Sequence, residues 1–174
     1  KGTAMDLTAI DEAIRVVHRD RRWVLVPDAA AAATRLVELL RGDGAAGVMV
    51  VSATEGVGDL PDADRIHYTR TSGDSIMAGI RAFLASVEQP SEALVAAVDA
   101  FDPAGEAMVL GQGFSRRYRL AGRPVYGRRP RAWRDLEDKT TVDHLWDGAG
   151  IVRAPSVIVP VAHAARAAAT VASD

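Results

Sequence analysis

Residues 23–26 read WVLV, and residues 48–51 read VMVV. Both runs are apolar at every position, so neither face of either segment is suited to water. This pattern is typical of a β-strand that is buried on both faces. The two runs therefore predict a parallel sheet that is covered by helices on both sides.

The segments around these two runs fit the same architecture. Apolar residues recur at helical spacing in four segments, and three short segments resemble further strands. Asp28 follows the first strand directly and is placed to cap the next helix through its side chain. The alternation of strands and helices predicts an α/β fold, a Rossmann-like parallel sheet flanked by helices. One helix is expected to begin the segment 6–22, and the other expected helices are residues 29–41, 75–87 and 91–101. The further strands are residues 65–68, 107–110 and 125–126.

Ligands of parallel α/β sheets bind beyond the carboxyl ends of the strands. Four loops follow such ends here. The glycine pattern of a dinucleotide site is absent after the first strand, where Pro27 and Asp28 stand. Gly111 and Gly113 follow a later strand, but Arg116 takes the place of a third glycine, so we interpret them as a tight turn. The loops that could carry a site are residues 27–28, 52–58, 69–74 and 111–115.

The composition excludes several classes of function. The chain of 174 residues has a formal net charge of −2, which gives no argument for nucleic acid or a membrane as a partner. It contains no cysteine, which removes disulfides, thiol nucleophiles and cysteine-ligated zinc and is compatible with a cytoplasmic protein. No apolar run reaches the roughly 18 residues of a membrane span. The histidines have no metal-ligand spacing, and we assign no metal ligand and no catalytic residue.

Arginines crowd the segment from residue 116 to residue 134, and no acidic residue interrupts it. One hypothesis is an anion site, in which Arg116 and Arg128 bind a substrate phosphate or carboxylate. The other is a solvated basic surface, or a face that docks on an acidic partner. Charge clusters alone rarely identify a site, so the surface interpretation is favoured.

Residues 137–155 read EDKTTVDHLWDGAGIVRAP. Asp138 can cap a helix that begins at Lys139, and Gly150 suits the left-handed residue that ends one. Lys139 is unusual, because 19 of the 21 basic residues are arginine and a cation in the first helical turn opposes the helix dipole. A lysine ammonium is a compact charge that suits phosphate. The simpler interpretation is an ordinary solvated lysine.

This stretch resembles the ATP-grasp enzymes, in which an acidic residue and a lysine or arginine open a helix that is followed by a glycine, a proline and a short strand. In those enzymes the segment marks the entry from the pre-ATP-grasp domain into the ATP-binding region. The resemblance implies that residues 6–136 form a pre-ATP-grasp domain, that residues 137–174 begin the ATP-grasp domain, and that Lys139 binds ATP phosphates. The residues that carry the resemblance are Asp138, Lys139, Leu145, Ala149, Gly150, Ile151 and Pro155.

The ATP-grasp family joins a carboxylate to an amine through an acyl phosphate made with ATP and magnesium. The resemblance implies small-molecule carboxylate and amine substrates, and ATP and Mg²⁺ as cofactors. A homodimer is the assembly to test. The family's lid loop and acidic metal ligands would follow Asp174, so we expect an N-terminal fragment without ligase activity of its own. We expect residues 1–5 to be a cloning scar.

One alternative from a different class stays open. The chain would then be a stand-alone Rossmann-like binding or scaffold module whose basic stretch docks a partner. An open, apolar face at residues 157–161 would favour the fragment over this module.

Overall fold

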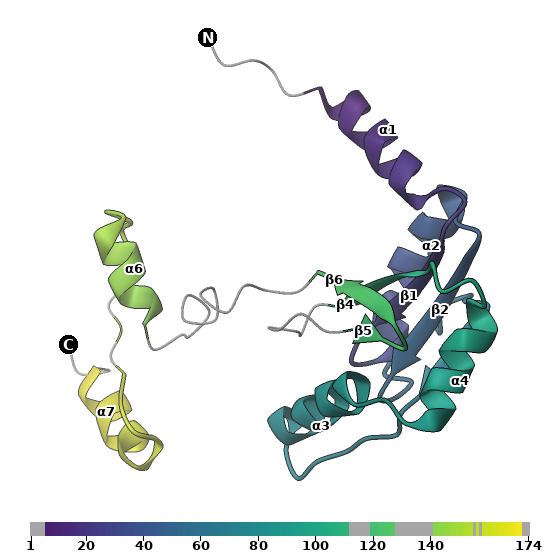
Figure 1. Ribbon diagram of the computed structural model, residues 1–174. Helices are drawn as coiled ribbons and strands as arrows, with labels where there is room; N and C mark the ends of the chain where they lie inside the picture. The colour runs from purple at the N-terminus through teal and green to yellow at the C-terminus, as the bar shows by residue number, and fades with distance from the viewer. Residues whose placement is uncertain (1–5, 112–118, 128–140, 155, 157, 172–174) are drawn as a thin grey trace. The chain divides into compact units, whose positions relative to one another are not determined.

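The core of the chain is a six-stranded, mostly parallel sheet in the order β3-β2-β1-β4-β6-β5 (Figure 1). The computed structural model describes residues 6–111, 119–127, 141–154, 156 and 158–171. It divides the chain into two units, Lys1–Arg129 and Pro130–Asp174. The sheet belongs to the first unit, and its strands are β1 (Arg22–Val26), β2 (Gly47–Ser52), β3 (Arg65–Tyr68), β4 (Met108–Gly111), β5 (Arg119–Leu120) and β6 (Arg123–Tyr126).

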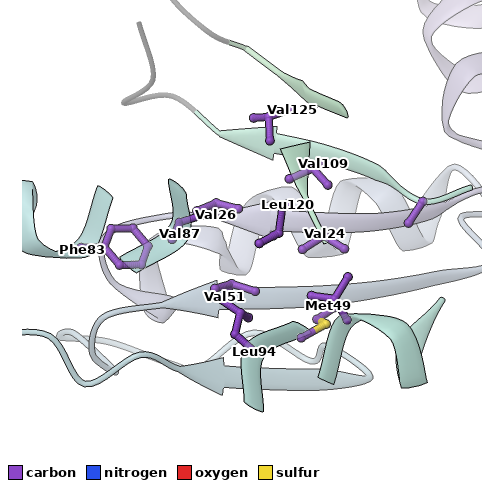
Figure 2. Packing of buried hydrophobic residues seen from close by; sticks show 12 residues of the cluster. Val24, Val26, Met49, Val51, Phe83, Val87, Leu94, Val109, Leu120 and Val125 are labelled. Carbon is purple, nitrogen blue, oxygen red and sulfur yellow. The ribbon is translucent and has the colours of Figure 1, made fainter. Parts of the chain in front are cut away.

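Both faces of the sheet are covered, as the fully apolar strands predict. Side chains alternate along β1, so Trp23 and Leu25 pack with one layer and Val24 and Val26 with the other. The first layer contains η1 (Ala30–Ala33) and α2 (Thr34–Gly42). The second contains α3 (Ile76–Glu88) and α4 (Glu92–Phe101), whose packing on the sheet is seen in Figure 2.

Most of the expected elements are confirmed with ends shifted by one or two residues. Local signals explain this success, since Ser75 and Ser91 cap α3 and α4 through their hydroxyls as serine does at helix starts. The hairpin of β5 and β6 was missed, except for residues 125–126. Its two-residue loop, Ala121 and Gly122, has positive φ at both positions, and alanine there hides the usual Asn-Gly signal of such a turn.

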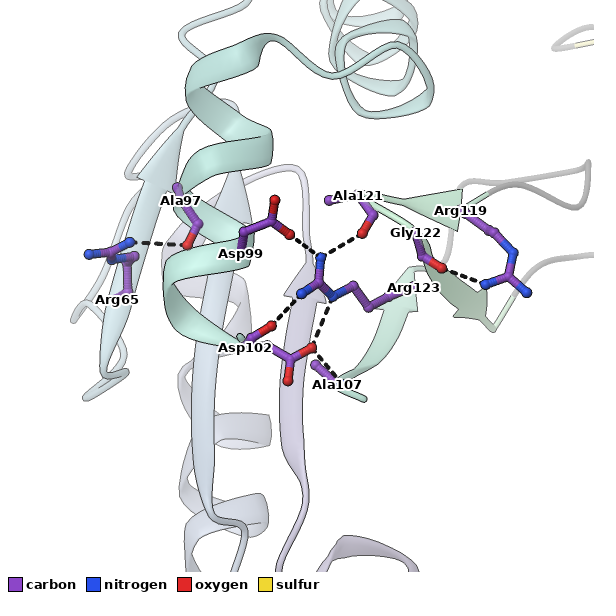
Figure 3. Close-up of polar contacts among 9 residues, drawn as sticks. All are labelled: Arg65, Ala97, Asp99, Asp102, Ala107, Arg119, Ala121, Gly122 and Arg123. Carbon is purple, nitrogen blue, oxygen red and sulfur yellow. Dashed lines mark hydrogen bonds and ion pairs between the residues drawn. The ribbon is translucent and has the colours of Figure 1, made fainter. Parts of the chain in front are cut away.

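A buried arginine joins the hairpin to the helical layer (Figure 3). The Arg123 side chain is only 5% exposed, and its Nε donates to Asp102 Oδ2 at 2.9 Å. Asp102 Oδ2 also accepts the Ala107 N–H at 2.8 Å, and the guanidinium contacts the Asp99 carboxylate as well. Burial alone would raise the pKa of Asp102, but the hydrogen bonds from Ala107 and Arg123 hold this pKa below its ordinary value. The cluster therefore fixes the end of α4 to β6.

The second unit contains α6 (Val142–Gly148), η3 (Val161–His163) and α7 (Ala164–Val171). Helix α6 begins three residues later than expected, with Thr141 as its N-cap, and Gly150 has the expected positive φ of 69°. Arg153 bridges back to Asp147, with Nε and Nη2 each 3.0 Å from a carboxylate oxygen. The short strand implied after Pro155 is wrong for the residues described there, 156 and 158–160, which have no strand conformation.

We predict that Asp102→Asn lowers the free energy of unfolding by roughly 3–5 kcal/mol at pH 7, because it breaks a buried ion pair and leaves Arg123 without this partner. The folded-state pKa of Asp102 lies below its unfolded value, so the carboxylate stabilises the fold above about pH 4 and this stability is lost as pH falls through the folded pKa. The difference between wild type and variant should therefore shrink at about pH 3.

Urea denaturation at both pH values measures this difference. Asp62→Asn is the matched control, since that side chain is 97% exposed. An equal loss of stability for Asp102→Asn at the two pH values would contradict the assignment.

Candidate functional site

A cavity of about 400 Å³ lies at the carboxyl ends of β1 and β4. The chain leaves β1 toward β2 and β3 on one side, and it returns through α3 and α4 to place β4 on the other side. The two crossover connections diverge between these strands, and this point of an α/β sheet is where ligands bind. The strand-end position of the cavity thus follows from the strand order.

The wall of the cavity is largely apolar and comes from both helical layers. Leu25 and Val26 close it from β1, and Leu110 closes it from β4. Leu36 comes from α2 on one face, and Ile80 and Leu84 come from α3 on the other. A cavity with such a wall favours the apolar part of a small molecule.

The start of η1 is closed to anions. The Ala30 N–H donates to the Thr54 carbonyl and the Ala31 N–H to the Glu55 carbonyl, both at 2.9 Å. Phosphate groups bind helix N-termini through such N–H groups when they are free. Here they donate to carbonyl groups of the loop after β2, so this position does not offer the phosphate-binding N–H groups of a nucleotide site.

The same contacts correct the expected role of Asp28. The N-cap of η1 is Ala29 and has no side-chain cap, so the prediction that Asp28 caps this helix is wrong. The reason is tertiary, because carbonyl groups of the β2 loop satisfy the N–H groups that a cap would take.

Asp28 instead contributes a negative charge to the cavity. Its backbone is held in place, since its carbonyl accepts the Ser52 hydroxyl at 3.0 Å and the Ala53 N–H at 3.2 Å. The residue is exposed to solvent, and it is the one charged residue among the described residues of the wall. An apolar wall beside a carboxylate suits a molecule with an apolar body and an ammonium group.

Two titratable side chains with shifted pKa values lie on β3, the edge strand that pairs with β2. Burial raises the pKa of the Tyr68 hydroxyl, and the charge of Glu55 raises it further. Burial also lowers the pKa of His67, with Arg65 adding to the effect. Both groups are therefore held in their neutral forms at pH 7. Neither lies in the cavity wall, which among the described residues contains no nucleophile and base pair.

The residues that the sequence singled out have different outcomes. Lys139, Arg116 and Arg128 lie outside the described residues. Within the basic stretch, Arg123 is buried and ion-paired, which overturns the surface interpretation for that residue. The loop of residues 27–28 does line the cavity.

The helical part of the wall was missed by sequence reasoning. Ile80 and Leu84 belong to the apolar stripe of α3, which predicts a position against the sheet but not one beside a cavity. The apolar spacing was the available signal, and it does not distinguish a core residue from a wall residue.

Comparisons with known proteins leave the site to be judged on its own residues. No protein-family model, no curated protein and no solved structure matches this chain. Among the described residues, no cluster of three histidine, aspartate or glutamate side chains could hold a metal ion. None of the helices in the described part of the chain has the length and apolar character needed to cross a membrane.

We predict that Gly56→Ala loosens the β2 loop from η1. Gly56 has φ of +81°, and an added Cβ would lie 2.7 Å from the Cβ of Ala29, so both backbone strain and a clash oppose alanine. The loss should be about 1–3 kcal/mol in the free energy of unfolding. Gly58→Ala is the matched control, since φ is also positive (+114°) but its Cβ would meet Ala31 at an ordinary 4.0 Å.

Thermal and urea denaturation compare the two variants, and amide hydrogen exchange at Ala30 and Ala31 reports the local bonds. Equal stability and equal exchange in both variants would contradict the role given to this contact.

Proposed function

We propose that residues 6–136 form the substrate-binding, Rossmann-like pre-ATP-grasp domain of an ATP-dependent carboxylate–amine ligase. The observation that carries this proposal is the cavity between the ends of β1 and β4, whose neighbouring helix start is closed to phosphate. Such a site suits an organic substrate better than a nucleotide. The volume of about 400 Å³ lies within the range of small-molecule sites, roughly 300–1,000 Å³.

The amine substrate fits this cavity better than the carboxylate does. The wall offers apolar contact from Leu36, Ile80 and Leu84, and Asp28 offers a negative charge. A carboxylate placed there would be repelled by Asp28 and would find the N–H groups of Ala30 and Ala31 already used. We therefore assign to the cavity an amine that carries an apolar group.

ATP does not suit this cavity, because the Ala30 and Ala31 N–H groups are already hydrogen-bonded and the described wall residues include no lysine or arginine. The described residues also contain no group of three carboxylate or histidine side chains that could hold Mg²⁺. In the proposed ligase ATP supplies the phosphoryl group that activates the carboxylate. Lys139 remains the proposed phosphate contact, on the strength of its sequence context alone. Arg116 and Arg128 remain proposed contacts of the carboxylate on the same basis.

The second unit supports a fragment over a stand-alone module. None of the described residues of α6 is buried, and Ile158 and Val161 are exposed. An exposed apolar face at this place is what a further packing partner would cover. The alternative is a module that docks through its basic stretch. Arg123 does not contribute to such a docking surface, because it is buried against Asp102.

The cavity can be tested on this chain with simple probes. We expect 2-phenylethylamine to bind more tightly than 2-phenylethanol or 3-phenylpropionate, as measured by NMR shift titration at pH 7. Asp28→Asn should remove the preference for the amine, a loss of about tenfold for one charge-assisted contact. Ala32→Phe should weaken all three probes, because Ala32 is an exposed residue of the wall and a larger side chain fills the cavity.

Asp62→Asn is the control for the loss of an exposed carboxylate away from the wall. Tighter binding of the propionate, or unchanged binding in Ala32→Phe, would refute the assignment of the cavity.

The ligase itself is tested by calorimetry with Mg·ATP on this chain and on the longer open reading frame that the proposal requires. We expect tight binding by the longer protein alone, weakened by Lys139→Ala, and no steady ATP turnover by the 174-residue chain. Turnover by this chain, or a longer protein indifferent to Lys139→Ala, would count against the proposal.

A further inference from the structure

Helix α3 changes from buried to exposed along its length. Phe83 and Val87, in its second half, are 1% and 0% exposed and pack in the same cluster as Val26, the last residue of β1 (Figure 2). Ile76 and Met77, in its first turn, are 84% and 55% exposed. The first half of the helix therefore extends beyond the part that packs on the sheet.

The exposed first turn of α3 continues the wall of the cavity. Ile80 and Leu84 form the α3 side of that wall, and both are half-buried. Ile76 and Met77 lie four and three residues before Ile80, and residues at these spacings are neighbours on a helix surface. One helical turn, about 5.4 Å, thus separates the wall from the two exposed side chains. We call Ile76 and Met77 the α3 rim.

The loop before α3 leaves the rim open, because it packs against another side of the helix. A Cβ at Gly73 would lie 2.5 Å from the nitrogen of Gly79 and 2.6 Å from the carbonyl carbon of Ala78, so the loop touches the helix backbone there. The Ser75 hydroxyl also accepts the Ala78 N–H at 3.2 Å. Ala78 lies two residues before Ile80, and residues at this spacing do not face each other on a helix.

The exposed apolar strip at the rim is narrow. Asp74 and Ser75 precede it, Arg81 lies one turn after Met77, and all three are exposed polar residues. Two aliphatic side chains offer roughly 200 Å² of apolar surface. Specific, stable protein interfaces bury about 1,200 Å² or more. The rim therefore suits a thin apolar chain better than the surface of another protein.

We propose that the cavity binds a long, unbranched alkylamine, whose ammonium group contacts Asp28 and whose chain leaves the cavity over the α3 rim. The chain passes from Leu84 and Ile80, which line the cavity, to Ile76 and Met77. This inference rests on the proposed function, which assigns an amine with an apolar group to the cavity, and it adds the shape and length of that group. A compact apolar group would fill the cavity without reaching the rim.

The part of the chain on the rim sets the expected gain in affinity. Each fully buried CH₂ group tightens binding by about fourfold. A chain on the rim is covered by protein on one side only, so we expect about twofold for each CH₂ group there. Four such groups beyond the cavity contribute roughly tenfold on this basis.

Two amines with the same number of carbon atoms test the proposal on the 174-residue chain, by NMR shift titration at pH 7. They are n-decylamine, which is long, and 1-aminoadamantane, which is compact. We expect Ile76→Gln/Met77→Gln to weaken n-decylamine about tenfold and to leave 1-aminoadamantane unchanged, because only the long chain reaches the rim.

Val16→Gln is the matched control for the loss of an exposed apolar side chain. Val16 lies on α1 (Leu7–His18), is 58% exposed and is outside the cavity wall, so this variant should bind both amines as the wild type does. Circular dichroism confirms that each variant is folded.

Unchanged binding of n-decylamine in the double variant, as when another protein surface covers the rim, overturns the proposal. An equal loss for both amines also overturns it, because the substitutions would then act on the cavity and not on the chain. Binding of 1-aminoadamantane that Asp28→Asn leaves unchanged counts against the proposed function instead, whereas a loss confined to n-decylamine in the double variant would still support a chain on the rim. A wild-type protein that binds neither amine refutes both.

Discussion

Burial of β1 on both faces is the constraint on which the rest of this structure depends. Val24 and Leu25 are almost completely removed from water, each by a different helical layer. Because β1 also pairs with β2 on one edge and β4 on the other, its residues 23–26 have no exposed edge and no exposed face. The chain therefore has to place strands on both edges of β1 and helices on both faces of the sheet. Its connections diverge between β1 and β4, and the cavity lies at the carboxyl ends of these two strands.

The chemistry of that cavity depends on which polar groups beside it already have hydrogen-bond partners. The loop after β2 returns to η1 and occupies the Ala30 and Ala31 N–H groups, which are the usual means of binding an anion in this position. What remains is an apolar wall with the charge of Asp28. In contrast, the strongest buried charges, Arg123 with Asp102, satisfy each other and hold the hairpin to α4. The charges of Arg123 and Asp102 thus stabilise the fold, whereas Asp28 is exposed at the cavity wall.

The sequence by itself determined the local elements. Fully apolar runs predicted β1 and β2, and side-chain caps at Ser75 and Ser91 marked α3 and α4, because strand burial patterns and helix caps are encoded over a few residues. Tertiary structure alone decided the strand order, the ion pair that buries Arg123, the displacement of Asp28 from its expected cap, and the choice of Ile80 and Leu84 as cavity wall. Each of these depends on contacts between residues far apart in the chain, such as the hydrogen bond of Ala30 with Thr54. Local sequence patterns do not specify such contacts.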